Sequence, residues 1–259
     1  MNKYISNIFD LDGKTAFVIG AGGHICSHLA FGLYESGCNI VVADLRQTSI
    51  DRFFDENNID DTKVLGVEMD ATVKQDHLSG LKKATAKFGK VDILVNGAGI
   101  NSPEPFLTIK EKDWHDVFNS QIHATFLGCQ VFGKHMTANK SGSIINISSA
   151  SAGPPLSKAF AYSASKAAIK NLTQNVAREF AKDGVRVNAI RPGFFPTKWN
   201  LENFLSDERI ESIMDHTPMR RFGHPKELIG SVIWLSSDSS SFVTGSEVAI
   251  DGGFSAMSI

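Results

Sequence analysis

Residues 15–30 read TAFVIGAGGHICSHLA, a short apolar run that passes through a glycine-rich turn into a helical pattern. The run predicts a buried strand, because its residues are apolar on both faces. Gly20, Gly22 and Gly23 would let the backbone approach a phosphate group closely, and the start of the helix would offer N–H donors and a favourable dipole. This stretch predicts a nucleotide-binding turn between a strand and its helix.

The alternation of strand and helix continues along the chain. β-rich runs occur at 15–20, 39–44, 63–70, 91–99, 142–149, 185–193 and 246–253, with amphipathic segments near 25–36, 72–88, 110–138, 160–183 and 225–237. This pattern predicts an α/β fold, a Rossmann-like doubly wound parallel sheet of about seven strands with helices on both faces. We find no linker or repeat, so we expect a single domain over residues 1–259.

Composition narrows the classes of function. Lys and Arg number 26 and Asp and Glu 28, so the formal net charge of −2 gives no reason to expect nucleic acid or an anionic membrane as a partner. Residues 1–15 have no apolar core of signal-peptide length, and no apolar run approaches the roughly 18 residues of a membrane span. We therefore expect a cytoplasmic protein. Its three widely spaced cysteines indicate small buried side chains rather than a disulfide framework or a metal site.

Glycine or polar residues end six successive β-rich runs: Gly20, Asp44, Asp70, Asn96 to Gly99, Ser148 with Ser149, and Pro192 with Gly193. Ligands of open parallel sheets bind beyond the carboxyl ends of the strands, so this set predicts one continuous crevice. The alternative is that each residue only marks a loop, which explains single positions better than the whole set.

Asp44 lies 24 residues after Gly20, at the end of the second predicted strand. A carboxylate there can accept both ribose hydroxyls and would repel a 2′-phosphate, which favours NAD over NADP. Arg46, two residues further on, could instead turn towards such a phosphate. Asp70 could accept from an adenine amino group, or it could cap the helix expected near Thr72.

Tyr162 and Lys166 are four residues apart, so they share one face of a predicted helix. That face continues through residues expected to pack on the sheet, namely Ile169, Thr173, Val176 and Phe180. Ser149 ends the preceding strand at the same edge, thirteen residues before Tyr162. A Tyr and a Lys at this spacing occur by chance in many helices, whereas the same pair with this Ser beside a nucleotide crevice indicates a catalytic set.

The motifs NGAG, INISS, YSASK, RPGFFPT and FVTGSEVAIDGGF together resemble the short-chain dehydrogenase/reductase superfamily over practically the whole chain. The resemblance implies hydride transfer between nicotinamide and an alcohol or ketone. Tyr162 would be the general acid/base, Ser149 would hydrogen-bond the substrate oxygen, and Lys166 would lower the pKa of Tyr162 and bind the nicotinamide ribose. An unperturbed Tyr pKa of ~10 is too high for an efficient base near neutrality, and a nearby ammonium favours the phenolate.

From the glycine turn and this resemblance together we expect NAD contacts at Gly20, Gly22, Gly23, His24, Ile25, Asp44, Asp70, Ala71, Asn96, Gly97, Ala98, Tyr162, Lys166, Pro192, Gly193, Phe195 and Thr197. Three features depart from the family pattern. The glycine motif T-G-x-x-x-G-x-G has Ile19, His24 and Cys26 at three of its positions, and Gly97 stands where Asn is more usual. Gln121 stands where a fourth catalytic residue is usually an Asn that kinks a helix and holds a water of the proton relay. We expect these changes to affect the rate rather than the reaction class.

Within the superfamily, GGHIC, HTPMRRFGHPKELIGSVIWLSS and DGGFSAMSI resemble the fructuronate (D-mannonate) reductase and gluconate 5-dehydrogenase group. The variable loop at about 194–223 offers cations and polar groups that suit a polyhydroxylated carboxylate: Lys198, Asn200, Arg209, His216, Arg220 and Arg221. The alternative is that most of these charges form a solvated helix face. Weaker candidates for substrate contact are Asn101, Ser102, His123 and Lys158.

The leading hypothesis is an NAD-dependent dehydrogenase of a polar hydroxy compound such as a sugar acid or polyol. The altered glycine turn and Gln121 leave open a catalytically impaired NAD-binding relative. A third possibility is an epimerase or dehydratase that uses NAD transiently, although residues 194–259 leave little room for the longer C-terminal domain usual in those relatives. The resemblance also implies a homotetramer in which helices 110–138 and 160–183 pair across one interface.

Overall fold

The computed structural model describes residues 3–57, 59–197, 201 and 205–257. Its seven strands are β1 (Thr15–Ile19), β2 (Asn39–Asp44), β3 (Val64–Glu68), β4 (Ile93–Asn96), β5 (Gly142–Ile147), β6 (Val185–Pro192) and β7 (Glu247–Ile250). They form one sheet in the order β3-β2-β1-β4-β5-β6-β7, and every neighbouring pair is parallel. The predicted doubly wound sheet is confirmed.

The helices follow the predicted segments closely, as α2 (His24–Glu35), α4 (Lys74–Phe88), α5 (Glu111–Phe118), α6 (Ala124–Ala138), α7 (Phe160–Phe180) and α10 (Ile229–Ser236). The single helix predicted over 110–138 is divided, because a π-helical turn at Asn119–His123 separates α5 from α6. No helix among the described residues is both long and apolar enough to cross a membrane.

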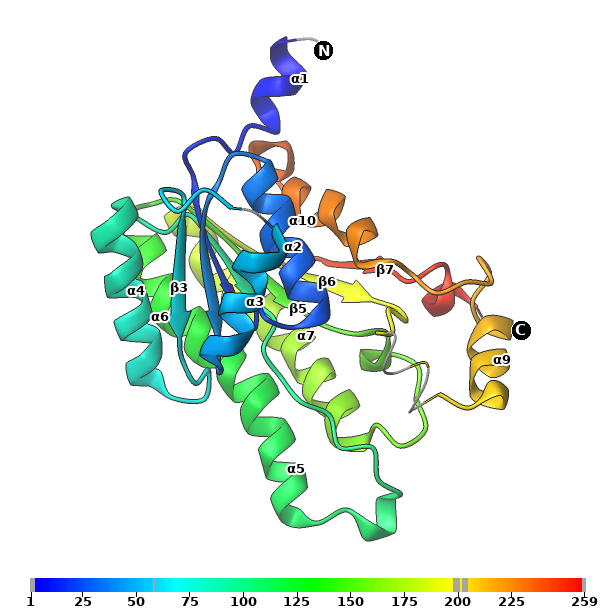
Figure 1. The fold of residues 1–259 in the computed structure, drawn as a ribbon. Helices are drawn as coiled ribbons and strands as arrows, with labels where there is room; N and C mark the ends of the chain where they lie inside the picture. Colours follow the sequence, from blue (N-terminus) through cyan, green and yellow to red (C-terminus); the bar gives the residue numbers. More distant parts are fainter. Residues whose placement is uncertain (1–2, 58, 198–200, 202–204, 258–259) are drawn as a thin grey trace.

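Three helices were not predicted: α1 (Lys3–Ile8), α3 (Gln47–Asn57) and α9 (Asp207–Asp215). α3 had a usable signal, since Ile50 and Phe53 stand three residues apart and are both buried. α1 has no buried residue and projects from the body of the molecule (Figure 1).

Two apolar layers hold the sheet between its helices (Figure 1). Residues of α2, α3 and α10 pack on one face of the sheet, and residues of α4, α6 and α7 pack on the other. All five residues of β1 and all four of β4 are buried, which explains why these runs are apolar on both sides. Burial of that surface is the main force that fixes the strand order.

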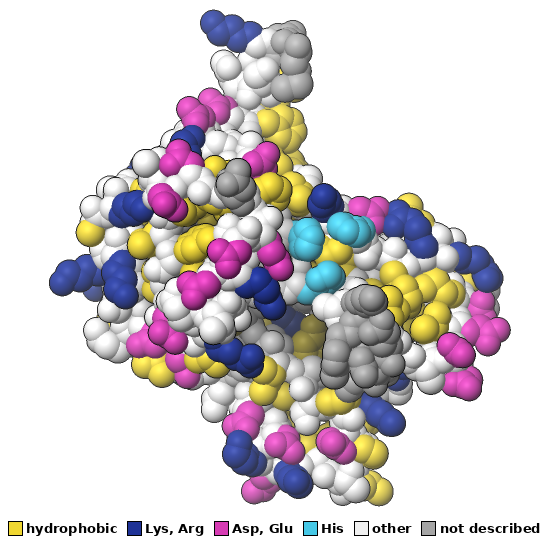
Figure 2. Space-filling model, in the orientation of Figure 1, with side chains coloured by type: hydrophobic (Ala, Val, Ile, Leu, Met, Phe, Trp, Pro, Cys, Tyr) yellow, Lys and Arg dark blue, Asp and Glu magenta, His cyan; other side chains and the backbone are white. Residues whose placement is uncertain are grey.

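The strand order reverses between β1 and β4. These two strands are adjacent and parallel, so their carboxyl ends lie at the same edge of the sheet. Gly20, directly after β1, has a φ of +80°, and a Cβ there would lie 2.8 Å from the backbone nitrogen of Ala98 after β4. The turns that follow these two strands are therefore packed together at the point where doubly wound sheets bind their ligands. Figure 2 shows a hollow in this face of the molecule, with histidine side chains at its rim.

Candidate active site

The glycine turn is tightly closed on itself and on β2. Gly23 N–H donates to the Gly20 carbonyl at 2.9 Å, and Gly22 N–H donates to Asp44 Oδ2 at 3.0 Å. A Cβ at Gly22 would lie 2.4 Å from Ser49 Cβ and 2.9 Å from Asp44 Oδ2, so only glycine fits there. Gly23 gives α2 no side-chain cap, which leaves N–H groups of the first turn for an anion. The residues present fit a dinucleotide phosphate.

The Asp44 carboxylate contacts the glycine turn, and the Asp70 carboxylate is bonded to residues that follow it in the chain. Asp44 Oδ1 also accepts from Arg46 N–H at 3.4 Å, while Arg52 of α3 donates to the Gly22 carbonyl at 2.7 Å. Asp70 Oδ1 accepts from the backbone and the hydroxyl of Thr72, at 2.8 and 2.7 Å. These bonds resemble the helix cap that we considered as the alternative role of Asp70. They lie just before the helix, however, because α4 begins at Lys74.

Asn96 uses its side chain inside the sheet. Its Nδ2 donates to Asn146 Oδ1 at 2.9 Å, and Asn146 Nδ2 donates to Thr173 Oγ1 of α7 at 2.9 Å. All three side chains are buried, so their polar groups satisfy one another. Asn96 can face a cofactor only with its backbone, and its amide group ties β4 through β5 to the helix of Tyr162.

Two departures from the family pattern explain each other. A Cβ at Gly97 would lie 2.1 Å from the sulfur of Cys26, which is itself buried. The thiol therefore occupies the space into which a side chain at 97 would project. Cys26 is larger than the glycine of the family pattern, and Gly97 is smaller than the usual Asn. The two differences offset each other, and α2 still packs closely on the carboxyl end of β4. Burial raises the pKa of Cys26 to about 12, which makes it an inert packing group.

Ser149, Tyr162 and Lys166 converge where β5 ends and α7 begins. Ser149 Oγ accepts from Ser151 N–H at 3.2 Å and from the Ser151 hydroxyl at 3.1 Å, and its interaction with the Tyr162 hydroxyl acts to lower the Tyr162 pKa. Lys166 Nζ donates to the Ile147 carbonyl at 2.6 Å and lies 5.4 Å from the centroid of the Tyr162 ring. The three groups predicted to carry the chemistry are thus assembled at the carboxyl edge of the sheet.

The predicted shift of the Tyr162 pKa has the wrong sign in this structure. Burial raises the pKa of Tyr162, and the hydrogen bond to Ser149 offsets only part of that rise. The ammonium of Lys166 lies over the ring and bonds the Ile147 carbonyl, and burial lowers its own pKa to about 8. Desolvation therefore outweighs the attraction between the ammonium and the phenolate.

Gln121 lies in the π-helical turn between α5 and α6, so the helix is irregular where the family pattern expects a kink. Its side chain is 2 % exposed, and Nε2 donates to the Ile100 carbonyl at 2.9 Å. A Cβ at Gly99 would lie 2.3 Å from the Gln121 amide, so the longer side chain is accommodated against glycine. Gln121 Oε1 is buried and has no hydrogen-bond partner among the described residues.

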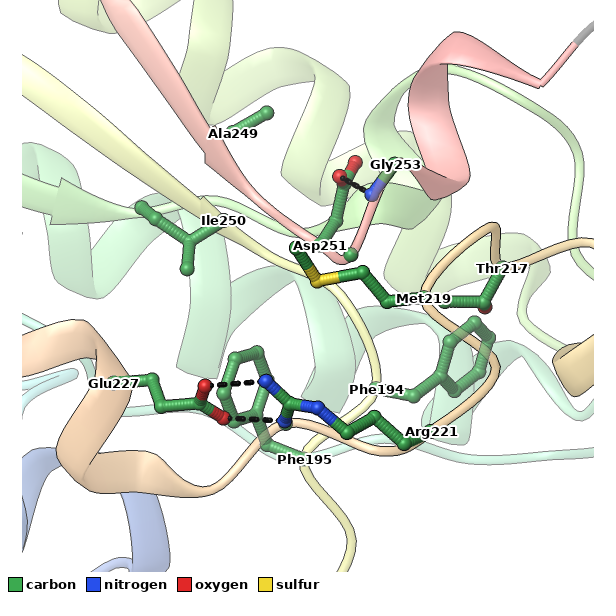
Figure 3. Close-up of a pocket in the computed structure, with 12 residues that line it drawn as sticks. Phe194, Phe195, Thr217, Met219, Arg221, Glu227, Ala249, Ile250, Asp251 and Gly253 are labelled. Atoms are coloured by element: carbon green, nitrogen blue, oxygen red, sulfur yellow. Dashed lines mark hydrogen bonds and ion pairs between the residues drawn. The ribbon is translucent and has the colours of Figure 1, made fainter.

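The loop expected at about 194–223 borders a pocket of roughly 360 Å³ together with the end of β7 (Figure 3). Phe194, Phe195, Met219 and Asp251 contribute to its wall, and Gly223 packs so closely on Phe195 that a Cβ would lie 2.3 Å from the ring. Ser149 and Tyr162 are not among the described residues that line it.

Most of the loop's predicted substrate ligands bind groups of this chain. Arg221 forms a two-bond ion pair with Glu227 at 2.7 and 2.8 Å, drawn in Figure 3, and Arg220 pairs with Asp215 at 3.1 Å. Arg209 donates to Ser157 Oγ at 2.7 Å, and the His216 ring packs on Phe254. Lys198 and Asn200 lie outside the described residues. The two ion pairs favour the solvated-face alternative for Arg220 and Arg221.

Sequence reasoning missed two groups near this edge. His28 and His224 join His24 in a row of edge-to-face rings, with neighbouring centroids 5.7 Å apart. The i, i+4 spacing of His24 and His28 was visible in the sequence, whereas the third ring comes from a distant loop. Glu247 of β7 accepts from Ser148, next to Ser149, across 99 residues of sequence, and no local pattern indicates that contact.

The sequence pattern of the family described as enoyl-(acyl carrier protein) reductase matches residues 20–255. A 2-dehydro-3-deoxy-D-gluconate 5-dehydrogenase of Escherichia coli (strain K12) is 35% identical over 96% of this chain and 98% of its own. The structure of a gluconate 5-dehydrogenase from Burkholderia cenocepacia in complex with NADP and tartrate has a TM-score of 0.90 and 30% identity, and covers 97% of this chain and 99% of its own.

A proposed D-mannonate oxidoreductase from Haemophilus influenzae with bound NAD also has a TM-score of 0.90, with 36% identity over 96% of this chain and 97% of its own. These likenesses extend over practically the whole chain, including the glycine turn and the segment of Ser149, Tyr162 and Lys166. The chain belongs to the short-chain dehydrogenase/reductase family of oxidoreductases.

Proposed function

We propose that this enzyme uses NAD(H) to interconvert a secondary alcohol and a ketone of a sugar acid or polyol. The observation that carries the proposal is the convergence of Ser149, Tyr162 and Lys166 beside the glycine turn. The proposed unit is one domain over residues 1–259, with 194–223 as its substrate loop.

In this mechanism a bound nicotinamide supplies or accepts the hydride. Ser149 donates a hydrogen bond to the substrate oxygen, which strengthens as negative charge develops on that oxygen during reduction. Tyr162 gives its phenolic proton to the same oxygen in reduction and takes a proton back in oxidation. Lys166, whose Nζ lies 5.4 Å from the centroid of the Tyr162 ring, would bind the nicotinamide ribose. Gln121 holds the Ile100 backbone, and its buried Oε1 supports a place for it in the proton relay.

We assign the dinucleotide to the residues around the two packed turns. Gly20, Gly22, Gly23, His24 and Ile25 would hold the pyrophosphate, and Asp44 would accept the ribose hydroxyls. The adenosine side would include Asp70, Ala71 and the backbone from Asn96 to Ala98. The nicotinamide side would include Pro192, Gly193, Phe195 and Thr197.

NAD is proposed over NADP because the Asp44 carboxylate faces the turn from 3.0 Å and would repel a 2′-phosphate. The neighbours differ on this point, since the Burkholderia cenocepacia structure is a complex with NADP and the Haemophilus influenzae structure has bound NAD. Arg46 is exposed and Arg52 donates to the Gly22 carbonyl, and among the described residues neither side chain forms an ion pair with the Asp44 carboxylate.

The substrate class is proposed from the relatives' activities on gluconate, 2-dehydro-3-deoxy-D-gluconate and mannonate. Arg209 is the loop cation best placed to help, because it bonds Ser157 rather than a carboxylate of this chain. The relatives named for an activity are dehydrogenases or reductases, which supports this function over an impaired NAD-binding protein or an epimerase.

A homotetramer in the cytoplasm is part of the proposal. Ala164 and Ala167 are exposed on α7, and the neighbouring Phe160 is 40 % exposed, so this helix offers a close-packing face to a second copy. Three buried free cysteines suit a reducing compartment. Light scattering of the purified protein tests the assembly.

The proposed function is tested with a panel of hexonates, hexulosonates and polyols, each with NAD(H) and NADP(H), followed at the absorbance band of reduced nicotinamide. We expect turnover with at least one C5 hydroxyl or keto sugar acid, and a higher kcat/KM with NAD(H). Dinucleotide that binds without turnover on any member of the panel would favour the impaired relative. Retained NAD with no net redox change would favour the epimerase.

A further inference from the structure

A cluster of charged side chains centred on the buried carboxylate of Glu247 contacts Ser148, the residue before Ser149. Glu247 of β7 has a side chain only 8 % exposed, and its Oε1 accepts from Ser148 Oγ at 2.7 Å. Its Oε2 accepts from Arg191 of β6 at 3.1 Å and lies 3.6 Å from Lys170 Nζ of α7. One carboxylate thus joins three neighbouring elements to the residue that precedes the catalytic serine.

The three partners of Glu247, namely Ser148, Arg191 and Lys170, lie near different parts of the catalytic set. Ser148 is 1 % exposed and its N–H donates to the Ile190 carbonyl, so both its backbone and its hydroxyl are held. Arg191 Nη1 lies 3.8 Å from the Cβ position of Gly153, in the turn that Ser149 caps. Lys170 is one helical turn beyond Lys166 and two beyond Tyr162.

Such a cluster fixes geometry more than it adds stability. The attraction between a buried carboxylate and its cations is largely offset by their desolvation, and removal of one partner leaves the others uncompensated. The Arg191 side chain is 18 % exposed, and its buried Nε has no hydrogen-bond partner among the described residues. Without the carboxylate, this guanidinium would have to move, and the turn that carries Ser149 would move with it.

We propose that Glu247 is a positioning residue, whose carboxylate holds Ser148 and Arg191 so that the Ser149 hydroxyl meets the hydroxyl of Tyr162. The inference rests on the proposed function for its effect on turnover, but not for its effect on the geometry of Tyr162. A misplacement of about 1 Å at a reacting centre can cost about 100-fold in rate.

The test uses Glu247→Ala, with Glu247→Gln as the conservative variant. Glu68→Ala is the matched control, since Glu68 also lies on an edge strand, at the opposite side of the sheet, and is exposed. We expect Glu247→Ala to lower kcat by about 30- to 100-fold with the dinucleotide Kd changed less than twofold. Glu247→Gln, which keeps hydrogen-bonding groups for Ser148 and Arg191 but not the negative charge, should recover part of that loss. Glu68→Ala should match the parent protein.

A second readout needs no turnover. The chain has three tyrosines, so tyrosine labelled with ¹³C at Cζ alone gives three NMR signals, and Tyr162→Phe identifies the one of interest. Glu247→Ala should shift the Tyr162 signal by disturbing its bond to Ser149, and Glu68→Ala should not. If Glu247→Ala fails to fold, Ser148→Ala removes only the hydroxyl contact and should shift the same signal.

An unchanged Tyr162 signal in whichever variant folds would overturn the proposal, as would a Glu247→Ala enzyme with the parent kcat. A rate loss that Glu247→Gln does not recover, with no shift in the Tyr162 signal, would also contradict it. If the parent protein turns over nothing in the panel, the proposed function fails, while the NMR comparison still decides the role of Glu247.

Discussion

The packing of Cys26 against Gly97 makes a quantitative prediction. In Gly97→Ala the new Cβ would lie 2.1 Å from the Cys26 sulfur, against an optimum of about 3.5–4.0 Å for carbon atoms in contact. The new methyl group has little room to move away, because Ile147 Cγ1 lies 3.3 Å and the Ile19 carbonyl oxygen 3.4 Å from the same position. Gly97 is not among the glycines with positive φ, so the penalty comes from packing rather than from the backbone.

Overpacking of this kind costs about 1–3 kcal/mol, and each kcal/mol lowers Tm by roughly 2–4 °C in a domain of nearly this size. Gly97→Ala should therefore melt roughly 2–12 °C below the parent protein. In Cys26→Ala the sulfur is gone, and the Cβ of Gly97→Ala would occupy its space. The double variant should thus recover part of the loss, with a favourable coupling free energy of about 1–3 kcal/mol.

Denaturant unfolding of the four proteins measures this cycle. Gly230→Ala is the matched control, because a Cβ at Gly230 of α10 meets nothing within 4 Å, and it should be neutral or stabilising. A Gly97→Ala protein as stable as the parent, or additive effects of the two substitutions, would refute the reasoning that these residues changed as a pair.

Three further outcomes are expected. Burial lowers the pKa of Lys166 to about 8 from its ordinary 10.5, so between these values the unfolded chain binds more protons and stability rises with pH. The unfolding free energy of the parent relative to Lys166→Met should increase by about 2 kcal/mol from pH 8 to pH 10 in denaturant melts, and a flat difference would contradict the shift. Asp44→Ala should raise the ratio of kcat/KM for NADP to that for NAD about tenfold or more in steady-state assays, and an unchanged ratio would remove Asp44 from cofactor choice. Gln121→Leu leaves the Ile100 carbonyl without its donor and should lower the unfolding free energy by about 1–3 kcal/mol, whereas a neutral result would mean that this bond does not hold the turn.

The sheet and its ligand edge were predictable because their signals are local. Strands buried on both faces must be apolar throughout, and Gly20 and Asp44 stand out from these runs because a glycine or a charged residue at the end of an apolar strand is visible in the sequence. Tyr162 and Lys166 share a helix face for the same local reason. Of the predicted packing face, Ile169 and Thr173 are buried, whereas Val176 and Phe180 are only partly buried against the core.

What the sequence could not provide depends on contacts between distant segments. The packing of Cys26 against Gly97 and the hydrogen bond between Ser148 and Glu247 join residues that are far apart in the sequence. Neither contact can be identified until the fold is known. The pKa of Tyr162 was given the wrong sign because spacing shows where the ammonium is, but not how deeply the phenol is buried. Arg221 looked available for a substrate until Glu227 was found beside it.

The central claim is that the Tyr162 hydroxyl transfers the proton that accompanies hydride transfer. Tyr162→Phe removes that oxygen and keeps the ring against Lys166, so the variant can be compared with the parent in both dinucleotide binding and turnover. We predict an unchanged dinucleotide Kd and a loss of about 100- to 10,000-fold in kcat with the sugar acid that the parent enzyme uses. Turnover at the parent rate in Tyr162→Phe would contradict the account.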